Sequence, residues 1–347
     1  MAGAGEWPPR KEAAVAAFFE LANRQGLLPL LMADPDLPDA VAAAKSRFRA
    51  LEALYRKRYE LSRIGTLELS RVLGRDSFLF YKGSDYRHRL YDKPELRTMT
   101  DVDVYVPAPK LQAALERLTA AGYPRKYVAY GAHFAPGFYD VSFEVKGVHV
   151  EIHRSFAQRV RAGIDYDGIW RRREWFEADG IAGYRLSPAD SILVQAYSLA
   201  KDEFSSDLNR YLDFYLLLQR YGGGLRDCVR YARAWAIQRP LFGALHLTSS
   251  LFPSARTAAV SESIGLLLSA RTRTFLAGRV LPDPGKEPSG HVTGRRVQLW
   301  RKYWLIDTLW RRLAFVAHHG WETIAGLAVE WRLRRSGLFL PPRSTTR

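Results

Sequence analysis

Residues 81–106 read YKGSDYRHRLYDKPELRTMTDVDVYV, and this stretch decides the fold. It holds a Lys-Gly-Ser turn at Lys82–Ser84 and, further on, Asp101 and Asp103 among the strand-forming residues Val102 and Val104. Side chains two residues apart on a strand point to the same face, so the two carboxylates project together. Two such carboxylates raise each other's pKa unless a cation lies between them. The strand therefore predicts a cation site at its start.

A third carboxylate for this site comes from a later strand. The segment YDVSFEVKGVHVEIH alternates around a Lys-Gly turn and predicts a hairpin with strands Val141–Val145 and Val148–His153. If the second strand pairs beside the Asp103 strand, Glu151 joins the two aspartates. Carboxylate oxygens are hard ligands that suit Mg²⁺. His149 and His153 share the Glu151 face and would suit a transition metal, but the aspartates favour Mg²⁺.

The residues just before the acidic strand predict a phosphate site. The aromatic-rich strand SFLFY runs into Lys82, Gly83 and Ser84 at the expected start of a helix. Backbone N–H groups and a hydroxyl in such a turn can bind phosphate, and the lysine can neutralise its charge. Arg97 has two readings: it pairs with an aspartate structurally, or it contacts a triphosphate.

Taken in order, several short motifs in this part of the chain resemble one known family. They resemble the polymerase-β nucleotidyltransferase superfamily and, within it, the family of uncharacterised nucleotidyltransferases. The resemblance runs from about residue 10 to about residue 220 and includes LSPAD at 186–190 and LDFYLLL, with Asp213, at 212–218. The motifs that carry it are Lys82-Gly83, Tyr91, Arg97, Asp101-x-Asp103, Gly122-Tyr123 and Val150-Glu151-Ile152-His153.

The resemblance implies a reaction and a set of site residues. The reaction is Mg²⁺- or Mn²⁺-dependent transfer of a nucleoside monophosphate, AMP in the first instance, from ATP or another NTP to an acceptor hydroxyl, with release of pyrophosphate. The acceptor would be a peptide, a small metabolite or another anionic or hydroxyl-bearing molecule. The residues expected to bind metal and catalyse are Asp101, Asp103 and Glu151; those expected to bind nucleotide are Lys82, Gly83, Ser84, Arg97 and His153; and His133, Tyr197 and Lys201 are expected on the acceptor side.

Two alternatives stay open from the sequence. One is phosphoryl transfer from the same metal site, as in a kinase. The other is a protein that binds nucleotides or other anions without catalysis. The complete set of three acids argues against the second alternative.

The expected fold is α+β, with a small mixed sheet between flanking helices and a mostly helical C-terminal region. Helical spacing dominates before residue 75 and after the Ser187-Pro188 start signal. We expect N-terminal helices at 1–75 that pack on a nucleotidyltransferase core at 76–180. A helical domain at 181–280, a loop at 281–294 and a basic Trp-rich extension at 295–347 with a disordered tail complete the expected organisation.

Charge and hydropathy limit the partners and the location. The net charge of +16 favours anionic partners, and residues 294–347 hold eleven Lys and Arg against three Asp and Glu. Glu6, Glu12 and Glu20 interrupt the N-terminal apolar segment, which argues against a secretory signal, and no apolar run is long enough to span a bilayer. We therefore expect a cytoplasmic protein. The tryptophans of the extension favour packing against helices over an acidic membrane surface or an anionic macromolecule.

Overall fold

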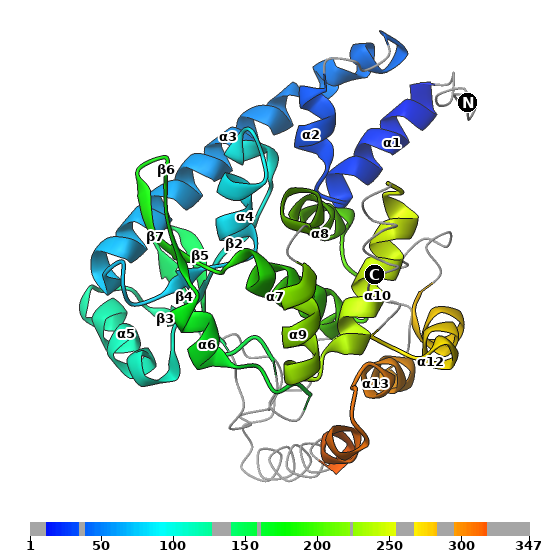
Figure 1. The fold of residues 1–347 in the computed structure, drawn as a ribbon. Coiled ribbons are helices and arrows are strands. Elements are labelled where there is room, and N and C mark those ends of the chain that lie inside the picture. The colour runs from blue at the N-terminus through cyan, green and yellow to red at the C-terminus, as the bar shows by residue number, and fades with distance from the viewer. Residues whose placement is uncertain are drawn as a thin grey trace, which may run out of the picture.

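The computed structural model describes residues 12–34, 39–126, 140–157, 161–222, 225–254, 267–282 and 295–317. Within these ranges one mixed sheet is covered by helices and leads into a helical C-terminal region (Figure 1). The α+β class expected from the sequence is confirmed.

The described strands form a single sheet in the order β3-β4-β5-β2-β1-β7-β6. β2 lies at the centre, antiparallel to β1 and parallel to β5, while β1 runs parallel to β7. The predicted hairpin is confirmed as the antiparallel pair β4 and β5. The strands are β1 (Leu79–Phe80), β2 (Asp101–Tyr105), β3 (Arg125–Lys126), β4 (Asp140–Val145), β5 (Val148–His153), β6 (Glu174–Ala178) and β7 (Ile181–Arg185).

Helices precede, interrupt and follow the sheet. The N-terminal helices are α1 (Glu12–Arg24), α2 (Leu28–Ala33) and α3 (Asp39–Leu73). Within the sheet region lie α4 (Gly83–Arg89), the short 3₁₀ helix η1 (Pro94–Leu96), α5 (Ala108–Ala120) and α6 (Tyr166–Arg171). After it come α7 (Pro188–Lys201), α8 (Leu208–Tyr221), α9 (Leu225–Trp235), α10 (Gln238–Leu251), α12 (Ala270–Phe275), η3 (Leu276–Val280) and α13 (Arg295–Trp304).

The two faces of the sheet belong to two different cores. Val102 and Val104 of β2 are fully buried in a cluster with Leu69 of α3 and Leu118 of α5. Alternate residues of the same strand face the other way, and Tyr105 joins the larger cluster built on α7, α8 and α10. The two aspartates share this second face with Tyr105 because strand side chains alternate. The fold thus points the carboxylates toward the helical region.

The sheet extends beyond the boundary at residue 180 that separated two predicted domains. β6 and β7 form a hairpin whose turn contains Asp179 and Gly180, and β7 pairs with β1. The last strand of the sheet therefore ends at Arg185. Ser187 then accepts a hydrogen bond from the backbone N–H of Asp190 at 3.3 Å and caps α7, as the sequence signal predicted.

The N-terminal helices are tied to the helical region as well as to the sheet. Gln25 supplies both its side-chain oxygen, which accepts from Leu208 N–H at 3.0 Å, and its carbonyl, which accepts from Asn209 N–H at 3.2 Å. The first N–H groups of a helix have no partner within the helix, and the N-cap residue of α8, Asp207, makes no side-chain capping bond to them. A distant residue therefore caps α8.

The described part of the C-terminal extension packs on the helical region. Trp304 contacts Phe275 edge to face at 4.8 Å between ring centroids, and Leu305 is only 3% exposed. Asp307 accepts hydrogen bonds from the first backbone N–H groups of α10, at 2.6 Å from Gln238 and 2.9 Å from Arg239. The packing expected of the tryptophans is thus present at Trp304, whereas Trp300 and Trp310 are exposed. Trp321 and Trp331 lie outside the described residues.

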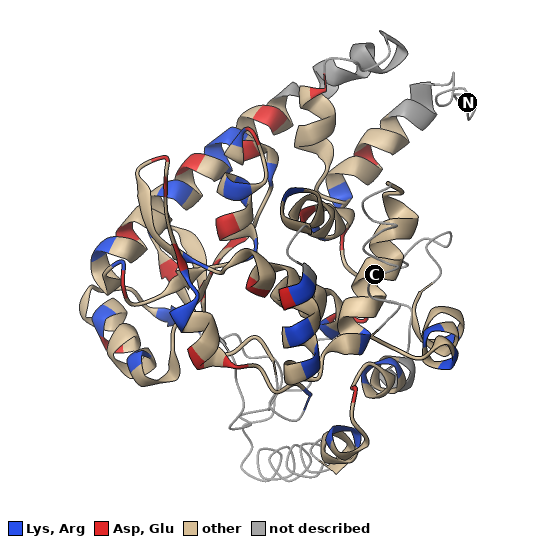
Figure 2. Ribbon diagram, viewed as in Figure 1, with Lys and Arg blue, Asp and Glu red and all other residues tan. Residues whose placement is uncertain are grey.

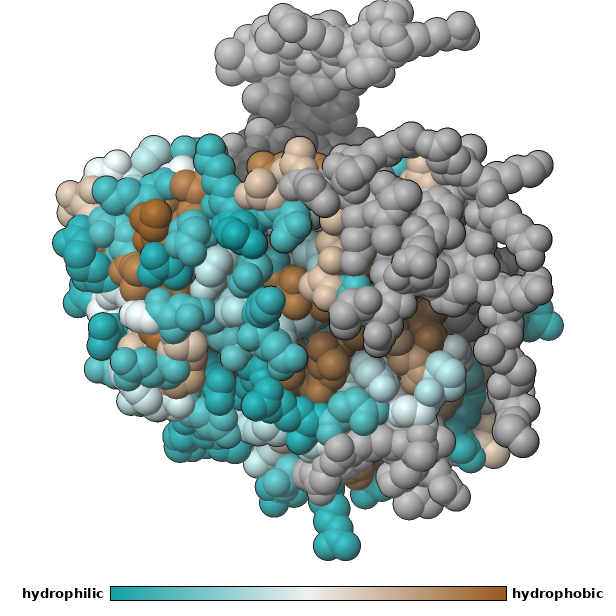
Figure 3. All heavy atoms as spheres, turned by 90° about the horizontal axis from the view of Figure 1, so that it is seen from above, coloured by the Kyte–Doolittle hydropathy of each residue, from teal (hydrophilic) through white to brown (hydrophobic). Residues whose placement is uncertain are grey.

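Charge is unevenly spread over the helices. Lys, Arg, Asp and Glu are interspersed along α3, whereas α12 and α13 carry Arg and Lys without any acid (Figure 2). The described surface seen from above is largely hydrophilic, with separate apolar patches (Figure 3). Among the described residues, no helix combines the length and the hydrophobicity needed to cross a membrane.

Candidate active site

Backbone pairing brings the predicted carboxylates together. In the parallel pair of β2 and β5, Asp103 lies directly opposite Glu151 and Asp101 lies opposite His149. The expectation that the Glu151 strand pairs beside the Asp103 strand is confirmed. Within the described residues, Asp103, Glu151 and His153 offer ligand atoms that all lie within 4.8 Å of one another.

Asp103 is the most strongly held of the acids. It is 5% exposed, and one of its oxygens, Oδ1, lies 2.8 Å from Lys82 Nζ and 2.8 Å from His153 Nε2. Burial alone would raise the pKa of Asp103, but Lys82 and His153 outweigh it and hold the pKa below its usual range. Asp103 is therefore an anion at neutral pH.

Asp103 in turn raises the pKa values of its two partners, Lys82 and His153. Burial and the nearby charge of Arg210 disfavour the ammonium of Lys82, yet Asp103 outweighs both and the pKa of Lys82 is raised. Burial likewise disfavours the charged His153 ring, but its bonds to Asp103 and Glu151, the latter at 3.3 Å, raise its pKa. The bond from His153 in turn lowers the pKa of Glu151.

Asp101 is not equivalent to Asp103. Burial, followed by repulsion from Asp103 and Glu151, raises the pKa of Asp101 to about 6. The Thr100 hydroxyl donates a long hydrogen bond of 3.5 Å to the Asp101 carboxylate. The ionised form of Asp101 is therefore disfavoured by its burial and by the neighbouring acids, and a bound cation would stabilise it.

The donor set fits a divalent metal ion. Carboxylates on neighbouring strands offer oxygen ligands of the type that Mg²⁺ and Mn²⁺ take, and burial together with repulsion from Asp103 and Glu151 raises the pKa of Asp101. His153 adds a nitrogen to the group, but its Nε2 is already engaged by Asp103. Asp103 and Glu151 lie close enough to hold such an ion together; His153 contacts both, and Asp101 lies two residues from Asp103 on the same strand face.

In the Lys-Gly-Ser turn predicted to bind phosphate, Lys82 and Gly83 line a pocket, but Ser84 does not. Lys82 adopts a left-handed backbone conformation (φ 52°), which is strained for a residue other than glycine and directs its ammonium to Asp103. Gly83 lines the adjoining pocket. Ser84 does not: it is 6% exposed, and its hydroxyl lies 2.7 Å from the carbonyl oxygens of Tyr81 and Asp103, to which it donates. Its side chain thus ties α4 to β2.

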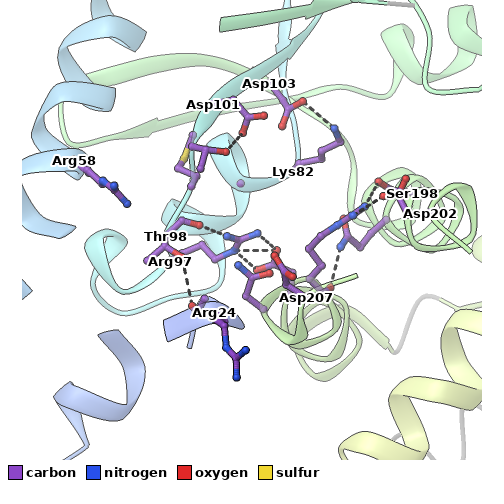
Figure 4. A pocket seen from close by; sticks show the side chains of 18 of the residues that line it. Arg24, Arg58, Lys82, Arg97, Thr98, Asp101, Asp103, Ser198, Asp202 and Asp207 are labelled. Atoms are coloured by element: carbon purple, nitrogen blue, oxygen red, sulfur yellow. Dashed lines mark hydrogen bonds and ion pairs between the residues drawn. The ribbon is translucent and has the colours of Figure 1, made fainter. Parts of the chain in front are cut away.

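A pocket of about 510 Å³ opens beside the acids (Figure 4). Its walls come from α1, α3, the segment before β2, α7 and α8, so widely separated parts of the chain enclose it. The size is within the usual range for small-molecule sites. Its charged lining residues are Arg24, Arg58, Lys82, Arg97, Lys201, Arg210, Asp101, Asp103, Asp202, Asp207 and Asp213.

Arg97 takes the structural partner that the sequence allowed. Its guanidinium bonds both oxygens of Asp213, with Nε 2.8 Å from Oδ1 and Nη2 2.7 Å from Oδ2. Tyr91 donates to the same carboxylate at 2.8 Å. Burial disfavours the charged Arg97, but Asp213 outweighs it and raises its pKa. Arg97 also lines the pocket, so this buried pair shapes the wall near Asp101.

The residues predicted on the acceptor side separate. Lys201 lines the pocket near the C-terminus of α7. Tyr197, on the same helix, is 3% exposed and faces Arg161, whose guanidinium lies 5.7 Å from its ring centre, rather than the pocket. His133 lies outside the described residues.

Sequence reasoning missed Arg210 as a site residue. Its guanidinium is held in place by Asp202 at 2.5 Å, Ser198 at 2.7 Å and Ser206 at 2.9 Å, and its charge reaches Lys82. Gln195 donates to the Arg210 carbonyl at 2.9 Å and lines the same wall. No local motif marks this arginine, because its supports come from α7 and from the connection before α8.

A comparison with models of protein families finds a match. The family model described as "Uncharacterised nucleotidyltransferase" matches residues 11–253, which include α1 to α10 and the whole sheet. No curated protein matches the chain. The matched range includes every pocket-lining residue and leaves out the basic extension.

Proposed function

The chain belongs to the family of uncharacterised nucleotidyltransferases, and from this premise we propose that it transfers a nucleoside monophosphate from an NTP to an acceptor hydroxyl and releases pyrophosphate. ATP is the proposed donor and Mg²⁺ the proposed ion. One observation carries the proposal: Asp103 lies opposite Glu151 on β2 and β5, Asp101 shares its strand face, and both aspartates line a polar pocket.

The chain's own residues have separate tasks in this reaction. Asp101, Asp103 and Glu151 would hold the divalent ion, which when bound neutralises phosphate charge and lowers the pKa of an acceptor hydroxyl. Lys82 and Arg210 both line the pocket, and the N–H groups that their carboxylate partners leave over can donate to the phosphates of the donor. Arg210 is suited to this because three hydrogen bonds already fix its guanidinium.

Glu151 is the residue that we propose orients the acceptor. It is only partly buried, and its lowered pKa keeps it ionised at neutral pH, so it can accept a hydrogen bond from the attacking hydroxyl. In the transfer, a bond forms between the acceptor oxygen and the α-phosphorus while the bond from that phosphorus to pyrophosphate breaks. The hydroxyl proton leaves to a carboxylate or to solvent.

The test of the reaction type is the mass of the product. The full-length protein, ATP, Mg²⁺ and a pool of peptides and small metabolites are incubated together, and the products are analysed by mass spectrometry. We expect AMP adducts and free pyrophosphate, and neither in the presence of EDTA. Phosphate adducts with ADP release would instead show kinase-type transfer, and ATP binding with no adduct of either kind would show a protein that binds nucleotide without catalysis.

A substitution at Gly83 should test nucleotide binding without disturbing the fold. A Cβ at this position would lie 3.5 Å from Met99 Cβ, which is ordinary van der Waals contact, so Gly83→Ala should fold normally. Because Gly83 lines the pocket, the added methyl would hinder close approach of a phosphate to the backbone. We expect roughly tenfold weaker binding of Mg-ATP by calorimetry with an unchanged melting temperature. Equal affinity in the variant would remove Gly83 from the nucleotide site.

A further inference from the structure

Among the described residues, six cations line the pocket; one of them, Lys201, lies near the end of α7, and the other five fall into two groups. Three of them are committed to carboxylates: Lys82 to Asp103 at 2.8 Å, Arg97 to Asp213 at 2.7 Å and Arg210 to Asp202 at 2.5 Å. Arg24 and Arg58 also line the pocket, but no hydrogen bond or ion pair joins either of them to another described residue. Both side chains are exposed. They are therefore open to a ligand.

These two arginines come from the N-terminal helices, on the side of the pocket away from the acids. In Figure 4, Asp101 and Asp103 lie on β2 at the top, Arg58 reaches in from α3, and Arg24 lies at the lower edge on α1. The positions of α1 and α3 are linked, because the Tyr55 hydroxyl on α3 donates to the side-chain oxygen of Asn23 on α1.

The helix end that carries Arg24 is also fixed against α8. Gln25, the next residue, caps α8 through Leu208 and Asn209. Gly26 follows at φ 70°, and a Cβ there would lie only 2.9 Å from Asn209 Cγ, so this contact leaves no room for a side chain. The backbone under Arg24 is thus built into the pocket wall, while its guanidinium remains accessible.

We propose that Arg24 and Arg58 form a second anion subsite of the pocket, which takes a phosphate group. This subsite rests on the proposed nucleotidyl transfer for its substrates. Guanidinium groups bind phosphate oxygens through paired, charge-assisted hydrogen bonds, and two unpaired ones on a single wall favour an anion over a neutral group. The phosphate has two possible sources: the terminal phosphate of the NTP, or a phosphate carried by the acceptor.

The test uses Arg24→Gln and Arg58→Gln in the full chain, with Arg63→Gln as the matched control. Arg63 lies on α3 like Arg58, but it pairs with Glu60 at the surface and does not line the pocket. Calorimetry measures Mg²⁺-dependent binding of ATP, AMP and inorganic triphosphate, and then the binding of inorganic phosphate to protein already saturated with Mg-ATP. Melting temperatures should be unchanged in all three variants, since the substituted side chains are not buried.

The result expected for an NTP source is about tenfold weaker binding of ATP and triphosphate in each pocket variant, with AMP unaffected. The result expected for an acceptor source is unchanged ATP affinity and loss of the phosphate that binds alongside ATP. Either pattern supports the subsite. Affinities that match the wild type in both experiments, a wild-type protein that binds no phosphate-containing probe, or an equal loss in Arg63→Gln would overturn it.

The subsite and the proposed function can fail separately. If the wild type binds triphosphate through Arg24 and Arg58 but forms no nucleotidyl adduct, the subsite stands and the function falls. If the adduct forms at the same rate in both pocket variants and all affinities are unchanged, the function stands and the subsite falls.

Discussion

Asp103→Asn and Asp101→Asn are expected to abolish metal-dependent turnover equally and to change stability in different ways. Each variant removes an oxygen anion from the proposed metal site, and we expect turnover to fall by at least about 10³-fold in both. In metal-free buffer, Asp101→Asn should leave the melting temperature unchanged or raise it. The reason is that the ionised Asp101 is disfavoured in the folded state, where its pKa is raised to about 6.

The Asp103→Asn variant is expected to lower the melting temperature. Its pKa is lowered, so the carboxylate stabilises the folded state at neutral pH and its loss costs stability. Asp103→Asn leaves Lys82 without its 2.8 Å partner, which should cost about 2 kcal/mol after allowance for the partial exposure of the lysine. Thermal melts in EDTA and turnover with Mg²⁺ check both variants. Equal melting temperatures, or retained turnover in either variant, would contradict this assignment.

The largest loss of stability is expected from Asp213→Asn. Asp213 is 1% exposed and forms the bidentate pair with Arg97, which is 7% exposed. Asparagine preserves the size of the side chain and its bond from Tyr91, but leaves the Arg97 charge buried without a counter-charge. Breaking such a pair costs about 3–5 kcal/mol, which corresponds to a fall in melting temperature on the order of 10 °C.

Two further variants separate the charge effect from other causes. Arg63→Gln breaks an exposed pair with Glu60 and should change stability by less than about 0.5 kcal/mol. The double variant Arg97→Met with Asp213→Leu removes both buried charges and should recover most of the stability that Asp213→Asn loses. A double variant as unstable as Asp213→Asn would show that the charge imbalance is not the cause.

The strands that carry the acids could be predicted because the local sequence of each one shows a strand pattern. Val102 and Val104 alternate with the aspartates, and the Lys146-Gly147 turn closes the hairpin that contains Glu151. Two local patterns, one on each strand, were enough to predict that Asp103 and Glu151 lie on paired strands, as the structure shows. The opposite electrostatics of Asp101 and Asp103 were not predictable, since they depend on where Lys82 and His153 point.

Other features depend on contacts between distant segments. The hairpin of β6 and β7 was missed although Asp179-Gly180 is a common turn signal between strands, because its outer strand alternates weakly. Ser84 was expected to face phosphate, and nothing in its local sequence reveals the carbonyl of Asp103 that it contacts instead. Arg24, Arg58 and Arg210 become pocket residues only after α1, α3 and α8 have come together.

The capping of α8 by Gln25 also has a consequence for synthesis of the chain on the ribosome. Gln25 can cap α8 only after Leu208 and Asn209 have been made. At about 5–20 residues per second, this delay lasts on the order of ten to forty seconds. During that time the pocket lacks α7 and α8, so the nascent protein carries its acidic strands and N-terminal arginines without an assembled pocket. The pocket can therefore assemble only after α8 has been made.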